Sequence, residues 1–226
     1  GPWSTINGAN ATTLQPNQVG LLTDTTYFRA ELTNGVCTPV YSSITTVNVR
    51  ATTVAGTASS NQTICNGKIP SGLAVTGYAG QYFLWQWASN SNGPWGNVTS
   101  VTYTTPSISS TQMTSAAGGG TFVSTRYFRV IVINSPCPND TSNIVTINVN
   151  SLPVVNAGLD FSICAGSQAT LSGSGAVTYT WSGGVVNNVP FTPNASAAYT
   201  VIGTDANGCT ASDAVVVTVN QPSVAG

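Results

Sequence analysis

Charged side chains are scarce in this chain. Its 226 residues include five lysines or arginines, six aspartates or glutamates and no histidine, so that 5% of the chain is charged, against about 25% in an ordinary soluble domain. The net charge of −1 supplies no basic surface, which excludes nucleic acid as a partner. Without histidine, serine and threonine nucleophiles lack their usual base, and a zinc site lacks one of its main ligand types.

Other ingredients of catalysis and of membrane insertion are missing as well. A glycosidase needs two carboxylates that face each other across the substrate, and the spacing of the six acidic residues singles out no pair. We therefore expect no catalytic residue, no cofactor and no enzymatic activity. No apolar run approaches the ~18 residues that span a bilayer, and the first residues do not resemble a signal peptide. We interpret the chain as a mature secreted protein or a segment of a longer one.

Serine, threonine, asparagine and glycine supply most of the polarity, and this mixture suits strands and turns better than helices. Residues 127–133 alternate, with the aromatic or aliphatic residues at 128, 130 and 132 on one side. Residues 145–149 and 215–219 alternate in the same way, and the sequence DANG at 205–208 predicts a turn. Short strands separated by such turns predict β-sandwiches, with no helix longer than a turn or two.

Two stretches one hundred residues apart carry the same landmarks. YFRAELTNGVC occupies residues 27–37, and YFRVIVINSPC occupies residues 127–137. A fainter third copy spans residues 199–209, and the tripeptide Gly-Pro-Trp occurs at residues 1–3 and again at 93–95. Internal repetition of this kind is typical of tandem modules.

The repeat divides the chain into modules. Residues 1–50 correspond to the C-terminal part of a truncated module, residues 51–150 to a complete larger one, and residues 151–220 to a complete smaller one. Residues 221–226 would begin the next linker. The joints between modules are too short to act as loose tethers, so we expect an all-β fold whose sandwiches form an elongated string and contact their neighbours in the same chain.

The five cysteines favour an oxidising, extracellular compartment. Cys65 and Cys164 each stand before a glycine turn upstream of a complete copy, and Cys137 and Cys209 close the two copies. The repeat therefore predicts the disulfides Cys65–Cys137 and Cys164–Cys209. Cys37 has no upstream cysteine, and by the hundred-residue offset we expect its partner about 35 residues before the first residue of the chain.

The tryptophan-containing strand is expected to face the core. Period two places Phe83, Trp85 and Trp87 on one face of the run YFLWQW, and Trp87 aligns with Trp181 of the smaller module. We interpret Trp87 and Trp181 as buried core tryptophans. Two repeat landmarks are also expected in the core, namely Tyr127 and Tyr199.

A carbohydrate contact is the competing role for aromatic residues. The larger module carries an insertion around residues 90–120, which includes Trp95 and Tyr103. Exposed aromatic rings can stack on sugars, so these two residues form the candidate ligand contact. Arg29 and Arg129 stand in the middle of predicted strands, where we expect structural roles.

Three carboxylates of the smaller module form the candidate metal site. Asp160, Asp205 and Asp213 could converge at one end of the module and bind calcium, although the oxygen-rich loop spacing of such a site is missing. A zinc site is not expected, because the chain contains neither histidine nor a CxxC pair.

Ordered motifs of the smaller module resemble a known repeat. In chain order they are NAGLD at 156–160, ICAG at 163–166, TLSGSG at 170–175, YTWS at 179–182, FTP at 191–193, YTV at 199–201 and GTDANGC at 203–209. This string closely resembles the Ig-like and PKD-like repeats of large cell-surface proteins of Bacteroidetes, the SprB-like gliding-motility adhesins among them. The resemblance covers the smaller module throughout. The resemblance extends to the truncated and the larger module through the stretches from Tyr-Phe-Arg to Cys at residues 27–37 and 127–137. In the larger module it also includes the tryptophan-containing strand.

The resemblance implies immunoglobulin-like or PKD-like sandwiches, export by the type IX secretion route and display as a filament attached to the outer membrane. Such a filament would serve adhesion and gliding, with the secretion and motility machinery as partners through other parts of the parent. A surface polysaccharide or the substratum would be the external partner. Asp24-Thr25-Thr26 resembles the O-glycosylation motif of exported Bacteroidetes proteins, which makes Thr25 a candidate for modification.

Three functions remain open from the sequence. The first is a structural stalk of a surface adhesin, without a ligand site of its own. The second is a carbohydrate- or surface-binding module that uses Trp95 and Tyr103, and the third is an accessory domain of a secreted enzyme. A concave row of exposed rings at Trp95 and Tyr103 would favour binding, whereas burial of these rings would favour the stalk.

Overall fold

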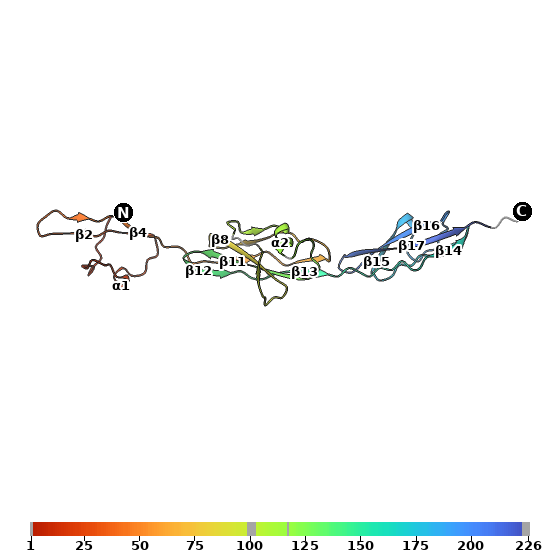
Figure 1. Ribbon diagram of the computed structural model, residues 1–226, viewed down its shortest axis with the longest axis horizontal. Coiled ribbons are helices and arrows are strands. Elements are labelled where there is room, and N and C mark those ends of the chain that lie inside the picture. Colours follow the sequence, from red (N-terminus) through yellow and green to blue (C-terminus); the bar gives the residue numbers. More distant parts are fainter. Residues whose placement is uncertain (1, 99–102, 117, 223–226) are drawn as a thin grey trace.

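The computed structural model describes residues 2–98, 103–116 and 118–222. It shows three units arranged end to end as an elongated string (Figure 1). We call them the N-terminal segment (residues 2–50), the middle module (51–150) and the C-terminal module (151–222). Of the expected linker at 221–226, residues 223–226 lie outside the described part. Strands outnumber helices in all three units, which confirms the all-β fold.

The middle module is a sandwich of two sheets. One sheet has the strand order β6-β13-β11-β8-β9, with β12 also paired to β11, and the other has the order β10-β7-β5. The elements are β5 (Thr57–Ala58), β6 (Gln62–Cys65), β7 (Leu73–Thr76), β8 (Tyr82–Ala88), β9 (Gly96–Asn97), β10 (Ser107–Ile108), α2 (Ser110–Ala116), β11 (Arg126–Asn134), β12 (Cys137–Thr141) and β13 (Val145–Asn150). β6 runs parallel to β13, and the other paired strands are antiparallel. This is an immunoglobulin-like arrangement of two packed sheets.

The alternation predicted for the central strand is confirmed. β11 lies between β8 and β13, and its buried residues are Phe128, Val130, Val132 and Asn134. Tyr127 is on the opposite face, half-buried and outside the core cluster. The prediction that Tyr127 is a core residue is therefore wrong, because period two directs it away from Phe128.

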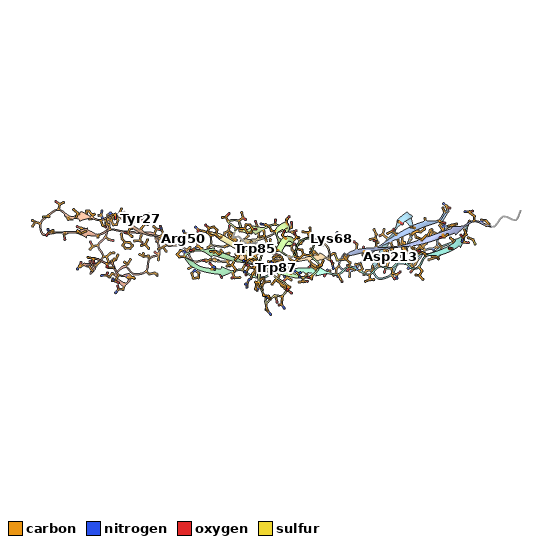
Figure 2. The ribbon with its side chains drawn as sticks, viewed as in Figure 1. Tyr27, Arg50, Lys68, Trp85, Trp87 and Asp213 are labelled. Atoms are coloured by element: carbon orange, nitrogen blue, oxygen red, sulfur yellow. A yellow bond between two sulfur atoms is a disulfide. The ribbon has the colours of Figure 1, made fainter. Side chains whose placement is uncertain are left out.

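The core tryptophan of the middle module is Trp85. Its side chain is 1% exposed, whereas Trp87 is partly exposed and packs against the edge of the same cluster. Both residues lie on β8, within the middle module in Figure 2. The prediction that Trp87 is a buried core tryptophan is therefore wrong: Trp87 packs only against the edge of the core, and Trp85 is the deeply buried ring.

The insertion of the larger module helps to close the sandwich. It contains helix α2, whose Met113 is fully buried, and the following Phe122 is buried in the same cluster. Residues 99–102 and 117 of the insertion lie outside the described part of the chain. Of the described remainder, Val98, Tyr103, Ile108, Met113 and Ala116 pack on the core of the middle module.

The C-terminal module repeats the first sheet in a smaller form. Its sheet has the order β14-β17-β16-β15, with β14 parallel to β17. The elements are β14 (Phe161–Cys164), β15 (Thr178–Trp181), the 3-10 turn η1 (Ser182–Gly184), β16 (Ala197–Thr204) and β17 (Thr210–Asn220). The opposite layer is formed by residues around two isolated bridges, Asn156 to Ser174 and Ala169 to Phe191.

Of the two core residues predicted for the C-terminal module, Trp181 lies in the buried cluster and Tyr199 packs against it. Trp181 is buried, and its Nε1 donates to Asn187 Oδ1 at 3.0 Å. Tyr199 is partly buried and packs against the same cluster, edge-to-face with Phe191 at 5.2 Å between ring centroids. The turn predicted at 205–208 connects β16 to β17, as the sequence indicates.

The N-terminal segment reproduces part of the middle module in strand register. It contains α1 (Pro16–Val19), β1 (Thr26–Phe28), β2 (Glu31–Leu32), β3 (Val40–Tyr41) and β4 (Thr45–Val47). Tyr27 pairs with Thr46 as Tyr127 pairs with Thr146. The two remaining residue pairs between β1 and β4 also have their counterparts one hundred residues later, between β11 and β13. The repeat in the sequence is therefore also a repeat in the fold.

Candidate functional site

A disulfide joins the middle module to the C-terminal module. Cys65, the last residue of β6, is bonded to Cys209 in the turn between β16 and β17, with 5.6 Å between the Cα atoms. Cys37, Cys137 and Cys164 are free thiols. The predicted pairs Cys65–Cys137 and Cys164–Cys209 are therefore both wrong: the bond connects successive modules instead of closing each one.

The parallel strands explain why pairing within a module fails. β6 lies beside the end of β13, so that Cys65 is opposite Asn150, whereas Cys137 stands at the start of the returning strand β12. Residues 137 to 150 cover roughly 40 Å at about 3.3 Å per residue, and a disulfide requires Cα atoms less than about 7 Å apart. The two cysteines of one module thus lie at its opposite ends.

Both cysteines of the junction are held by backbone hydrogen bonds. After Cys65, the Asn66 N–H donates to Asn150 O at 2.8 Å, and the Lys68 N–H donates to Cys65 O at 3.0 Å. Figure 2 shows Lys68 at the end of the middle module that faces the C-terminal module. Cys209 is fully buried, and its N–H donates to Asp205 Oδ1 at 2.8 Å. Each of the two cysteines is therefore positioned by hydrogen bonds within its own module, in addition to the disulfide.

The first joint of the string is held by hydrogen bonds. Asn134 Nδ2 donates to Ala51 O at 2.9 Å, and Cys137 Sγ lies 3.6 Å from the same oxygen. Ala51 follows Arg50, which Figure 2 shows between the N-terminal segment and the middle module. The hairpin turn of the middle module thus contacts Ala51 at the first joint, and the turn that contains Cys209 is bonded to the end of the middle module through Cys65.

The two candidate ligand contacts do not form an exposed aromatic row. Trp95 is partly buried, and the guanidinium carbon of Arg129 lies 4.2 Å from the centre of its ring. Arg129 is held in place by its Nε, which donates to Gln86 Oε1 at 2.9 Å. Tyr103 is partly buried against the core and forms a bridge to Phe83. One face of Trp95 is therefore occupied by an arginine and not by solvent.

The same stack recurs in the N-terminal segment. The Arg29 guanidinium lies 4.2 Å from the Trp3 ring centre and 3.9 Å from the Tyr41 ring centre. Both Gly-Pro-Trp tripeptides thus place their tryptophan against the arginine of the Tyr-Phe-Arg motif, an arrangement with favourable cation–π energy. The predicted structural role of Arg29 and Arg129 fits this geometry. The recurrence of both motifs was the signal in the sequence, although the stack itself was not predicted.

The three calcium candidates act separately. Asp160 accepts from the Val216 N–H, Asp213 accepts from the Ala157 N–H, and Asp205 caps its own turn. In the described residues, no group of three or more aspartate, glutamate, cysteine or histidine side chains is placed to hold a metal ion. The predicted convergence is therefore wrong. The hydrogen bonds from Ala157 and then Ala214 lower the pKa of Asp213, since both stabilise its charged form.

The N-terminal segment contains an open apolar hollow. It measures about 450 Å³ and is lined by Leu14, Gln15, Pro16, Val19, Gly20, Leu22, Phe28, Thr45 and Val47. Thr25, the predicted modification site, is exposed on the same segment. Within the described ranges, no helix has the length and apolar character required to cross a bilayer.

Comparison with known proteins identifies the family. Residues 1–51 and 54–151 match the family model described as a domain of unknown function, DUF8696, and the chain belongs to this family. No curated protein matches the chain.

Several solved structures show limited similarity. The insect immune protein hemolin is 12% identical over 86% of this chain and 56% of its own, with a TM-score of 0.38. A Ca²⁺-stabilised adhesin of an Antarctic bacterium is 12% identical over 86% of this chain and 56% of its own, with a TM-score of 0.33. A 1.5-MDa bacterial ice-binding adhesin is 17% identical over 79% of this chain and 68% of its own, with a TM-score of 0.33. This chain spans little more than half of the first two, and nothing about function follows from similarities this low.

Proposed function

We propose that the chain is a non-catalytic stalk segment of a secreted, surface-displayed filamentous adhesin. Its complete modules are residues 51–150 and 151–220, preceded by the C-terminal part of a truncated module and followed by the start of a linker. The observation that supports this most is the Cys65–Cys209 bond, which joins successive modules of an elongated string. A ligand-binding domain has no need of such a bond, whereas a load-bearing string benefits from it.

The bond restricts both modules at once. It spans a sequence separation of 144 residues, for which the chain-entropy model gives about 5 kcal/mol of stabilisation. A disulfide of this kind persists in an oxidising compartment, which supports an extracellular location. Under tension between the chain ends, the bond also carries the load past the residues it encloses.

A carbohydrate-binding module is the alternative, and it receives less support. Arg129 stacks on Trp95, and Tyr103 packs on the core of the middle module. Trp3 is 45% exposed, yet Arg29 lies against its ring as well. Sugar stacking requires a free ring face, and the described tryptophans of the Gly-Pro-Trp tripeptides share theirs with arginine. An accessory domain of a secreted enzyme is the third possibility.

Affinity electrophoresis through gels that contain polysaccharides tests the choice. We expect the wild-type chain and Trp95→Ala to migrate equally with and without polysaccharide, with Trp3→Ala as the matched control for an exposed ring. Retardation of the wild type by any polysaccharide would contradict a stalk without a ligand site. Loss of that retardation in Trp95→Ala alone would assign the contact to the insertion.

A test in cells addresses the stalk role directly. In cells that display the parent adhesin, residues 51–220 are replaced by an unrelated pair of β-sandwiches of equal length. We expect adhesion to persist, because a spacer contributes reach and not recognition. Loss of adhesion, with the adhesin still on the surface, would show that these residues bind the target.

We further propose that the parent is a Bacteroidetes adhesin of the SprB-like kind that serves gliding, exported by type IX secretion. The support is the motif string of the C-terminal module, and the exposure of Thr25 is compatible with O-glycosylation. An antibody against residues 151–220 should label intact wild-type cells and fail to label cells without a functional type IX route. Equal labelling of both strains would refute the route, and an intact mass equal to the peptide mass would refute modification of Thr25.

A further inference from the structure

Cys65 and Cys164 occupy the same position in successive modules. Each ends a short strand that lies parallel to the last strand of its module, opposite Asn150 and Asn220 respectively. In both modules the next N–H donates to that asparagine carbonyl, at 2.8 Å and 2.9 Å, and a turn closes onto the cysteine carbonyl at 3.0 Å. A glycine with φ of +81° or +84° completes the turn in each case. Cys65 is bonded to the following module, whereas Cys164 is exposed and free.

Cys209, Cys137 and Cys37 share the second position. Each lies in or directly after the hairpin turn at the opposite end of its unit, following β16, β11 and β2 respectively. Cys209 receives the bond from the preceding module, and Cys137 lies against the joint with the preceding unit through Ala51. Every complete module thus presents a hairpin cysteine at its leading end, which faces the preceding module. It presents a second cysteine, the trailing cysteine, at its trailing end, which faces the following module.

We propose that these cysteines form one continuous series of bonds between successive modules of this repeat. The trailing cysteine of each module bonds the hairpin cysteine of the next. Cys164 is then the site for the hairpin cysteine of a following module, and Cys137 and Cys37 are sites for the trailing cysteine of a preceding one. The partner is a further module of the same repeat, because such a module carries a hairpin cysteine at the end that meets the preceding module, as Cys209 meets Cys65. This linkage is independent of whether the parent is an adhesin.

The bond forms by thiol–disulfide exchange with a low-molecular-weight disulfide, such as glutathione disulfide. The Cys164 thiolate attacks the oxidant and releases one glutathione thiolate, and the hairpin thiolate then displaces the second. Two protein thiols are oxidised to one disulfide, while one glutathione disulfide is reduced to two thiols that take up the two protons.

Duplication of the C-terminal module tests the series. Residues 151–226 are appended after Asn220, so that the new joint repeats the existing Asn150–Ser151 joint. After oxidation with glutathione disulfide, we expect a peptide map to contain Cys65–Cys209 and a second bond from Cys164 to the appended Cys209. Cys164→Ser in the original C-terminal module should leave the appended Cys209 as a thiol. A free Cys164, a bond within the appended module, or loss of Cys65–Cys209 would each overturn the proposal.

A second variant tests the leading end without relying on the first. In this variant, residues 1–50 are removed, and a second copy of residues 51–150 is placed directly before residue 51. In this variant Cys65 of the added copy should bond Cys137 of the original middle module. Recovery of Cys137 as an alkylated thiol under oxidising conditions would overturn the assignment of that residue.

Discussion

Pulling the chain from its two ends should reveal the bond between modules as a limit on extension. The sequence separation of Cys65 and Cys209 is 144 residues, which correspond to roughly 480–520 Å of extended chain at about 3.3–3.6 Å per residue. With the bond intact, tension passes between two Cα atoms that are 5.6 Å apart. Unfolding of the enclosed residues therefore adds no length.

Single-molecule force spectroscopy with handles at both termini measures this difference. We expect the fully stretched length to be shorter by roughly 470–510 Å under oxidising conditions than after reduction, because the enclosed residues are bypassed. Cys65→Ser should reach the reduced length under both conditions. Cys137→Ser is the matched control and should behave like the wild type.

The result distinguishes the two pairing schemes. Bonds within modules would enclose residues 65–137 and 164–209, which together correspond to roughly 390–420 Å, and Cys137→Ser would then release part of that length. A limit that responds to Cys137→Ser, or an oxidised chain that extends fully, would refute the reasoning from the parallel strands.

Three further predictions concern the modules themselves. Phe128→Ala should lower the free energy of unfolding by about 3–5 kcal/mol in urea denaturation, because Phe128 is fully buried. Tyr127→Ala, on the half-buried face, should cost clearly less, and equal losses would contradict the assignment of faces. Met113→Ala should cost about 2–5 kcal/mol, with exposed Thr111→Ala as control, if the insertion is part of the core. The lowered pKa of Asp213 contributes stability that is present above the unfolded carboxyl value of about 3.9 and is lost as the pH falls through the lower folded value. Asp213→Asn should reduce this acid-dependent loss in thermal melts, and an unchanged pH profile would contradict it.

The repeat was the most informative feature of the sequence. An unbroken offset of one hundred residues predicted equivalent strands, and the register of β1–β4 matches that of β11–β13 pair by pair. Period-two alternation correctly separated the two faces of β11, but the prediction that Tyr127 lies in the core chose a residue of the less buried face. These predictions succeeded because both depend on local sequence, which fixes strand direction and side-chain alternation.

The cysteine pairing could not be found in this way. It depends on the direction of β6, which lies parallel to β13 and is not connected to it by a turn. A hairpin leaves a turn signal in the sequence, whereas a parallel pair is made by residues far apart in the chain. The role of Trp85 was missed for a related reason, because the alignment of Trp87 with Trp181 does not show how deep each ring lies.

Two covalent connections cross the junction between the middle and C-terminal modules. The main chain passes from Asn150 to Ser151, and the disulfide passes from Cys65 to Cys209. Because Cys65 and Asn150 are neighbours at the ends of parallel strands, about 4.8 Å apart, the two connections leave the same end of the sheet side by side. A single covalent attachment allows rotation about itself, whereas two adjacent attachments oppose rotation about either one. If the series continues along the repeat, every joint gains this second attachment, and the stiffness of the string follows from where one short strand ends.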